Sequence, residues 1–164
     1  VLFSRYQRSR DLIAVGAVIE SALELVRPRA RAVGLEPQYS AGTETIQVLA
    51  GAIRLEQVCV NLLLNALDAV EPNGGEVTIA LSQSGGEVRI AVQDTGPGID
   101  AAILPRITEP FFTTKHATEG LGLGLAISQA IVAEFHGRLE VISTPGQGTT
   151  VTVVLPATAK ETAA

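Results

Sequence analysis

Two side-chain amides, Asn61 and Asn65, stand one helical turn apart among apolar neighbours in the strongest predicted helix of this 164-residue sequence. The periodicity predicts a helix over residues 53–70, and Gln57 and Asp68 continue the polar line at helical spacing. Because nearly every neighbouring position is apolar, this line must face something that satisfies its hydrogen-bonding groups. Solvent could satisfy these groups, although solvated helix faces usually carry Lys and Glu. Amide oxygens are also hard ligands of the kind that share Mg²⁺ with phosphate groups.

A carboxylate followed by glycines forms the second candidate site. Asp94 comes directly after an alternating run that predicts a strand, and Gly96 and Gly98 follow it in a turn. A buried carboxylate at a strand end could accept a hydrogen bond from an exocyclic amine, and the glycines would let backbone approach a flat ring. Taken alone, these residues fit an ordinary Asp-Gly turn equally well.

Three glycines at alternate positions lead into a later predicted helix. Around Gly120, Gly122 and Gly124, free backbone N–H groups and the positive end of the helix dipole would favour phosphate. The segment lacks the Gly-Lys-Ser/Thr ending of a P-loop. It also fails the dinucleotide-binding fingerprint, because Leu125 and Ile127 stand three positions beyond Gly122 and Gly124. Glycine spacing alone is therefore a weak signal.

Residues 94–121 show little periodicity, and a compact domain rarely tolerates so long a segment unless it is functional or mobile. Within it, Phe111 and Phe112 could pin a loop, and Lys115 could meet phosphate oxygens. A hydrophobic loop anchor with a surface lysine is the alternative interpretation.

Composition limits the other function classes. The chain has 12 basic and 17 acidic residues, a net charge of −5 and a pI of about 5.0, which argues against nucleic-acid binding through phosphate electrostatics. Its 46% hydrophobic content is enough for a folded core, without a stretch long enough for a membrane span. The single Cys59 excludes an internal disulfide and is expected to be an inert core residue. His116 and His136 have no metal-ligand or catalytic spacing, so surface and helix-end roles are favoured for them.

The elements expected from periodicity and turn residues alternate between helices and short strands. We expect helices at 11–33, broken near Arg27-Pro28, at 53–70 and at 122–135, and strands at 35–40, 45–49, 76–82, 87–93, 138–143 and 149–155. The strands are expected to pair mostly as hairpins, including 35–40 with 45–49. This order predicts an α+β fold, a two-layer α/β sandwich whose mixed, mostly antiparallel sheet carries helices on one face.

Taken together and in this order, four segments resemble the catalytic and ATP-binding domain of bacterial sensor histidine kinases, within the wider group of gyrase-like, chaperone and mismatch-repair ATPases. The asparagine box corresponds to residues 55–69, the first glycine box to Asp94-Thr95-Gly96-Pro97-Gly98-Ile99, the phenylalanine box to Phe111-Phe112, and the second glycine box to Gly120-Leu121-Gly122-Leu123-Gly124-Leu125. The turn 146–149 also looks like the closing glycine turn of that family. The resemblance covers about residues 50–156 and implies its Bergerat-type ATP-binding fold.

The resemblance implies roles for individual residues. Asn61 and Asn65 would hold Mg²⁺ and the phosphates of ATP, Asp94 would bind the adenine amine, and Lys115 would reach the γ-phosphate, so that Asn61 and Lys115 are the catalytic candidates. The implied nucleotide-binding set is Asn61, Asn65, Asp68, Asp94, Gly96, Gly98, Ile99, Phe112, Lys115, Gly120, Leu121, Gly122, Leu123, Gly124, Leu125 and Thr149. Hydrolysing relatives typically carry Glu at the position of Asn61, so the amide removes their general base.

The resemblance also implies what lies around the domain. Neither histidine matches the family's phosphoacceptor pattern, so the substrate histidine is expected on a separate dimerisation domain, with a response regulator downstream and a homodimeric full-length protein. We expect residues 1–10 to end a dimerisation helix and linker, 11–156 to form the domain with an ATP lid over about 100–120, and 157–164 to be a disordered tail. A chain with no Met that opens at Val1 is expected to be part of a longer sensor, either with or without a membrane anchor. This fragment is expected to lie in the cytoplasm and to touch neither membrane nor nucleic acid.

Residues 65–69 and 109–115 look most like the nitrogen and C4-dicarboxylate sensors. Two rival functions keep the same fold. One is a nucleotide-binding or protein-interaction module that never transfers phosphate, and the other is stand-alone ATP hydrolysis, which Asn61 disfavours.

Overall fold

The computed structural model describes residues 10–71, 74–99, 102 and 121–158, and of residues 121–124 it describes only the backbone. The elements are β1 (Asp11–Ala14), α2 (Val15–Val33), β2 (Gln38–Ala41), β3 (Gln47–Ala50), α3 (Ala52–Val70), β4 (Val77–Ser84), β5 (Glu87–Asp94), α4 (Leu121–Glu134), β6 (Arg138–Thr144) and β7 (Gly148–Pro156). The expected lid over about 100–120 lies almost wholly outside the described residues, as do 1–9 and 159–164.

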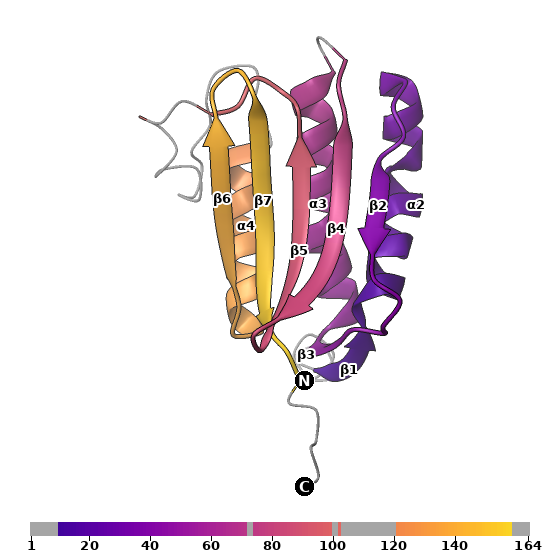
Figure 1. Ribbon diagram of the computed structural model, residues 1–164, viewed down its shortest axis with the longest axis vertical. Coiled ribbons are helices and arrows are strands. Elements are labelled where there is room, and N and C mark those ends of the chain that lie inside the picture. Colours follow the sequence, from indigo (N-terminus) through magenta and orange to yellow (C-terminus); the bar gives the residue numbers. More distant parts are fainter. Residues whose placement is uncertain (1–9, 72–73, 100–101, 103–120, 159–164) are drawn as a thin grey trace, which may run out of the picture.

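The helices form one layer and a five-stranded sheet forms the other (Figure 1). The strand order is β2-β4-β5-β7-β6, with β2 parallel to β4 and every other neighbouring pair antiparallel. A separate ribbon of β1 and β3 lies at one end. The predicted α/β sandwich, with a mixed and mostly antiparallel sheet and helices on one face, is therefore confirmed.

Helix α3 is the centre of the helical layer. It packs against α2, α4 and the sheet, and it buries apolar residues around most of its circumference: Leu55, Val58, Cys59, Leu62, Leu63, Ala66, Leu67 and Val70. The inward-facing residues of β4, β5 and β7 complete the same core. A helix enclosed on three sides can present only a narrow strip of polar residues, which is what the sequence shows at Asn61 and Asn65.

Two expectations about the first 33 residues are wrong. Residues 11–14 form strand β1 rather than the start of a helix, because they pair with β3, Leu12 opposite Leu49. Helix α2 also continues through Pro28, which is exposed, so the carbonyl that proline leaves without a partner can be hydrated. The helix ends instead at Gly34, whose φ of 76° allows the N–H of Leu35 to reach the carbonyl of Ala30 at 2.9 Å.

The expected pairing of residues 35–40 with 45–49 is also wrong. β2 joins the large sheet beside β4, whereas β3 pairs with β1. Alternating apolar residues identify a strand but not its partner, and here both partners are distant in sequence. The β4–β5 hairpin, α3, α4 and the β6–β7 hairpin agree with the sequence to within two residues at each end.

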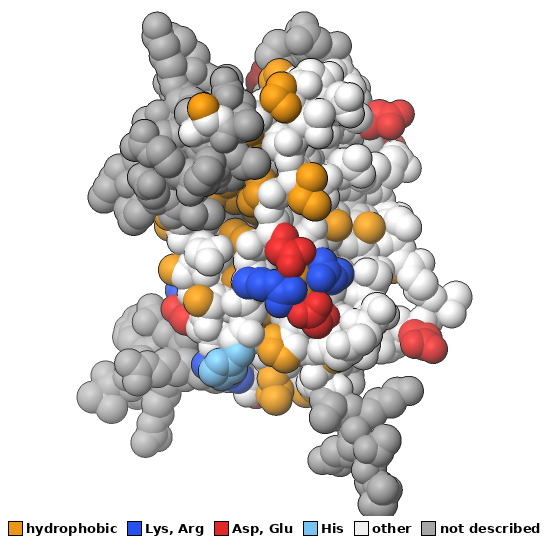
Figure 2. Space-filling model, turned by 60° about the vertical axis from the view of Figure 1, so that its left-hand side comes forward, with side chains coloured by type: hydrophobic (Ala, Val, Ile, Leu, Met, Phe, Trp, Pro, Cys, Tyr) orange, Lys and Arg blue, Asp and Glu red, His pale blue; other side chains and the backbone are white. Residues whose placement is uncertain are grey.

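A four-charge network lies on the sheet face opposite the helices (Figure 2). Arg89 and Arg138 each pair with both Glu87 and Glu140, and in the sheet register both arginines flank Val154, which is only 1% exposed. Their aliphatic stems therefore stand beside an apolar strand residue on the otherwise open face.

The structure predicts an unreactive Cys59. Its side chain is fully buried in α3, and burial raises the pKa of the thiol to about 12, so almost no thiolate exists at neutral pH. We expect a thiol-specific reagent to modify Cys59 only as the chain unfolds, with a labelling midpoint in denaturant that coincides with loss of helical circular dichroism. Rapid labelling of the native protein would contradict this burial.

Candidate functional site

The amide line on α3 divides into two environments. Gln57 and Asp68, at its ends, are exposed, whereas Asn61 and Asn65 between them are half-buried. The Nδ2 atom of Asn65 is buried and has no hydrogen-bond partner in the described part of the chain. A buried amide that the described residues leave unsatisfied is unusual, and it indicates a group prepared for a ligand or water.

Asp68 lies among charged neighbours. Its Oδ1 is 2.8 Å from Nη2 of Arg29 in α2, and Arg29 also pairs with Glu71. These two hydrogen bonds, that to Glu71 first, raise the pKa of Arg29. In this structure Asp68 therefore joins α2 to α3 beside the amide line.

Asp94 ends β5 with its side chain turned inward, and it is only 7% exposed. Its Oδ1 accepts a hydrogen bond from the N–H of Gly96 at 2.9 Å. Burial raises the pKa of this carboxyl, while backbone hydrogen bonds from Gly96 and Thr149 oppose the rise. Among the described residues no cation pairs with Asp94, so the carboxylate keeps its capacity to accept a further donor.

Gly96 connects the two candidate groups. A Cβ at this position would lie 2.8 Å from the carbonyl oxygen of Ala69 and 3.0 Å from its Cβ, so the backbone of the turn rests directly on α3. Ala69 stands one turn beyond Asn65 on the same helix face. The Asn65 end of the amide line and the turn after Asp94 are therefore neighbours.

The turn is held from both sides. Towards β4, the N–H of Thr95 donates to the carbonyl of Glu76 at 3.1 Å, and the Thr95 hydroxyl accepts from the Glu76 N–H at 2.9 Å. Towards the β6–β7 turn, the N–H of Gly146 donates to the carbonyl of Pro97 at 2.6 Å. Gly98, with a φ of 76°, leaves no room for a Cβ beside the carbonyl of Thr144.

Ser143 is a positioning residue that the sequence analysis missed. Its Oγ accepts a hydrogen bond from the N–H of Ile99 at 2.7 Å and lies 2.8 Å from the hydroxyl of Thr149. The same Oγ lies 3.1 Å from the carbonyl of Gly148, to which it donates. Because a serine has a single proton, Thr149 then donates to Ser143 and keeps its own oxygen as an acceptor. A serine within an alternating strand carries no sequence signal for this role.

Helix α4 is fixed at its end by two arginines, Arg54 from α3 and Arg10 just before β1. Nη2 of Arg54, at the start of α3, lies 2.6 Å from Oε1 of Glu134. Arg10 donates to the carbonyl of Glu134, and its Nη1 lies 2.9 Å from Nε2 of His136, which must accept because a guanidinium only donates. Cationic groups at a helix C-terminus also complement the helix dipole.

The ion pair between Arg54 and Glu134 shows the direction of α4 relative to α3. The start of α3 meets the end of α4, so the two helices run antiparallel (Figure 1). At 1.5 Å per residue, the 14 residues of α4 extend about 20 Å from Glu134, and the same length measured along α3 from Arg54 ends near Leu67. The N-terminus of α4 is therefore level with the Asn65 end of α3.

The structure thus brings Asn65, the turn after Asp94 and the start of α4 to one end of the sandwich, with Asn61 one turn earlier along α3. Ile99 and Leu125 are buried there as apolar supports. Phe112, Lys115 and Gly120 lie outside the described residues, and residues 121–124 contribute backbone only. In the described residues, no cluster of His, Cys, Asp and Glu could hold a metal ion, and no helix has the length and apolarity needed to cross a membrane.

Comparison with known proteins gives consistent matches. Residues 50–159 match the family described as histidine kinase-, DNA gyrase B- and HSP90-like ATPase. The C4-dicarboxylate transport sensor protein DctB of Rhizobium meliloti is 40% identical over 87% of this chain, and the sensor histidine kinase ZraS of Escherichia coli is 38% identical over 88%. This chain spans only 22% and 30% of those two proteins.

Solved structures agree with the sequence matches. The nucleotide-free catalytic domain of histidine kinase ThkA has a TM-score of 0.80 at 28% identity, covering 90% of this chain and 95% of that one. Full-length ShkA in complex with AMPPNP also has a TM-score of 0.80, at 34% identity, with 92% of this chain and 32% of that chain covered.

The raised pKa of Asp94 predicts how stability depends on pH. Below pH 3.8, the ordinary pKa of an aspartate carboxyl, Asp94 holds its proton in both the folded and the unfolded state. Above this pH the unfolded state loses the proton first, because the pKa is raised only in the folded state. As pH rises from 3.8 through the raised pKa of the folded state, we expect the free energy of unfolding of the wild type to fall relative to that of Asp94→Asn. Urea unfolding at several pH values measures this difference. A difference between the two proteins that does not change with pH would contradict the buried carboxylate.

The close contact at Gly98 predicts a large cost for adding a methyl group. Gly98→Ala should destabilise the domain by about 2–3 kcal/mol, because the Cβ meets the Thr144 backbone in addition to the strain of a positive φ. Gly85→Ala is the matched control, since its φ is 59° with open space around it, and should cost about 1 kcal/mol. Equal effects on the unfolding free energy would show that the turn is not held as described.

Proposed function

This chain belongs to the histidine kinase-, DNA gyrase B- and HSP90-like ATPase family, as an ATP-binding catalytic domain of the sensor histidine kinase type, and we propose that it transfers the γ-phosphoryl of Mg-ATP to a histidine on a separate dimerisation domain. The observation that carries the proposal is that the amide of Asn65, which has no hydrogen-bond partner among the described residues, lies on the same helix face as the contact with the turn after Asp94, a buried carboxylate without a described cation partner. The turn at Gly96 joins them at the end of the sandwich where α4 begins.

Asp94 would recognise the adenine. Its carboxylate is buried at a strand end and can accept a hydrogen bond from the exocyclic amine of the base. Gly96 and Gly98 keep side chains away from the ring, and the bonds to Glu76, Ser143 and Gly146 hold the turn in place. A turn that is held in place before the ligand arrives loses less entropy on binding.

Asn61 and Asn65 would hold Mg²⁺ and the phosphates. The unpartnered amide of Asn65 fits this role, because it is half-buried and committed to no other group in the described residues. Bound there, the ion would neutralise charge on the transferring phosphoryl group, which is most of what phosphoryl transfer requires of an enzyme. Two amides supply a weak site by themselves, so the ion would be shared with the nucleotide and keep several waters.

The remaining phosphate contacts rest on the family resemblance. Lys115 would meet the γ-phosphate, Phe112 would pin the lid, and the backbone of Gly120, Leu121, Gly122, Leu123 and Gly124 would cover the phosphates ahead of Leu125. The start of α4 lies level with Asn65, which supports phosphate binding at that helix terminus. Thr149 keeps an acceptor near the base, and Asp68 would act through its ion pair with Arg29.

The amide at Asn61 favours transfer over hydrolysis. Activating a water molecule needs a general base, and a carboxamide cannot accept a proton at neutral pH. The side chain can still orient a phosphate oxygen. The bound nucleotide would thus wait for a histidine nucleophile from outside this chain.

The proposed partners follow from the relatives. The full-length protein would be a homodimeric, cytoplasmic or membrane-anchored sensor that passes phosphate to a response regulator. The match to DctB favours the C4-dicarboxylate alternative within the nitrogen and C4-dicarboxylate subgroup, although ZraS matches almost as well. The subgroup stays a prediction.

Single substitutions should separate the two halves of the nucleotide site. We expect Asn65→Ala to reduce Mg-ATP binding below detection in isothermal titration calorimetry. Asp94→Asn should weaken ATP and ADP alike, by roughly ten- to a hundredfold, the range expected for one charged hydrogen bond. Gln57→Ala is the control, because Gln57 is exposed on the same helix face. Wild-type affinity in both site variants would rule out the assignment.

Phosphoryl transfer to a separate histidine is tested by following the label from γ-labelled ATP. The fragment, γ-labelled ATP and a dimerisation domain bearing a phosphoacceptor histidine should yield labelled histidine, with little phosphate released by the fragment alone. Nucleotide binding without label transfer would favour a pure binding module. Steady phosphate release from the fragment alone would favour a hydrolase.

A further inference from the structure

The outer face of α2 carries an ordered pattern of charge. Glu20, Glu24, Arg27 and Arg31 fall within an arc of about 60° on a helix that turns 100° per residue. All four are exposed, on the side away from the buried residues of α2. We call these four residues the α2 stripe. Both acids precede both bases along it.

This order is unfavourable for an isolated helix. Glu20 and Glu24 stand four residues apart, as do Arg27 and Arg31, and like charges at this spacing repel. Among the described residues the only ion pair of the stripe joins Glu24 and Arg27, and both remain more than half exposed. Arg31 has no ion pair within the described residues. Alternating the same four charges would have given the monomer more internal pairs.

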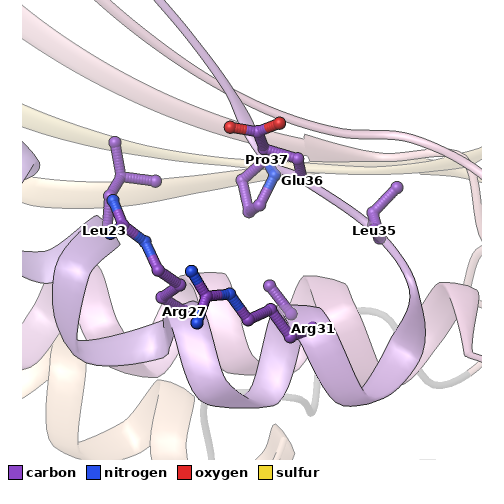
Figure 3. A pocket seen from close by; sticks show the side chains of 7 residues that line it. Leu23, Arg27, Arg31, Leu35, Glu36 and Pro37 are labelled. Carbon is purple, nitrogen blue, oxygen red and sulfur yellow. The ribbon is translucent and has the colours of Figure 1, made fainter.

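The stripe borders a groove. Two adjoining cavities of about 520 and 540 Å³ run along α2 and share Leu23 and Arg27. In Figure 3, Leu23, Arg27 and Arg31 come from the helix, and Glu36 and Pro37 face them from the segment that leads into β2. β2 is an edge strand of the sheet, so the groove lies at the open side of the domain.

We propose that the α2 stripe is a self-association surface whose occupant is the α2 stripe of a second copy of this chain, packed antiparallel about a two-fold axis. The four charges are symmetric about the point midway between Leu25 and Val26. An antiparallel copy therefore brings each Glu20 opposite an Arg31 and each Glu24 opposite an Arg27. An interface of this kind is isologous, because the same patch serves both partners.

Charge complementarity favours a second copy over other occupants. The stripe has no net charge but separates its two signs, so a uniformly acidic or basic peptide would be repelled by half of it. Only a partner with the reverse order matches both halves, and the antiparallel stripe is such a partner. The groove beside it offers apolar contact at Leu23, Leu35 and Pro37.

The surface leaves the proposed nucleotide site open. α2 and α4 lie on opposite sides of α3 in the helical layer (Figure 1). The stripe faces away from the buried side of α2, whereas Asn65 lies on α3, against which α2 packs. Association and nucleotide binding can therefore be measured independently, and failure of one does not imply failure of the other.

Charge reversal tests the proposal. Sedimentation velocity of the wild type at low ionic strength should show a monomer–dimer equilibrium below about 1 mM protein, the weak end of specific association. Glu20→Lys/Glu24→Lys and Arg27→Glu/Arg31→Glu should each be monomeric, because each makes the stripe uniformly charged. Mixing these two variants should restore a dimer. Asp11→Lys/Glu44→Lys, with the same charge change on other exposed positions, should behave as wild type.

Two further readouts keep the test decisive. The wild-type dimer should dissociate in about 1 M salt, where the Debye length falls to roughly 3 Å. Arg31→Gln, a milder change, should weaken the dimer if the doubly reversed variants do not fold. A monomeric wild type over the whole concentration range, dimers in both reversed variants, or no association on mixing would each overturn the proposal.

Discussion

The close approach of one turn to one helix underlies the whole candidate site. The backbone at Gly96 rests on Ala69 of α3 with no space for a side chain, and this contact places the carboxylate of Asp94 beside the helix face that carries Asn61 and Asn65. Everything around it maintains the contact. Thr95 and Glu76 fasten the turn to β4, while Ser143 and Gly146 fasten it to the β6–β7 turn. The described part of the site, Asn65 and the turn after Asp94, is thus built into the sandwich.

The enclosure of α3 explains why its polar groups are so informative. With α2, α4 and the sheet around it, the helix has little surface left for solvent, and a half-buried amide must be satisfied by something specific. The charged residues of α3 form ion pairs with the neighbouring helices: Arg54 pairs with Glu134 of α4, and Asp68 pairs with Arg29 of α2. Charge on this helix positions the layer, while the amide of Asn65 has no hydrogen-bond partner among the described residues. That division suits the proposed role of α3, in which its uncharged amides would hold a metal ion shared with the nucleotide.

The elements were predictable where contacts are local. The α3 and α4 helices and the β4–β5 and β6–β7 hairpins follow from periodicity and from glycine-rich turns, since neighbouring residues decide them. The errors all involve distant partners. Residues 11–14 became a strand because β3 was available to pair with them, and β2 joined β4 instead of the next strand along the chain. Pro28 did not end α2, because the helix is held against α3 on the opposite face and ends only at Gly34.

By itself, the sequence determined which residue types could do chemistry: the amide pair on an apolar helix, the carboxylate at a strand end and the glycines around it. Helical and strand spacing act over a few residues, so they can be read from the chain directly. Only the tertiary structure decided that these groups meet, that Ser143 and Thr149 share a hydrogen bond behind the turn, and that α4 begins level with Asn65. Such relations depend on packing between segments far apart in sequence, and no local pattern encodes a distance across the core.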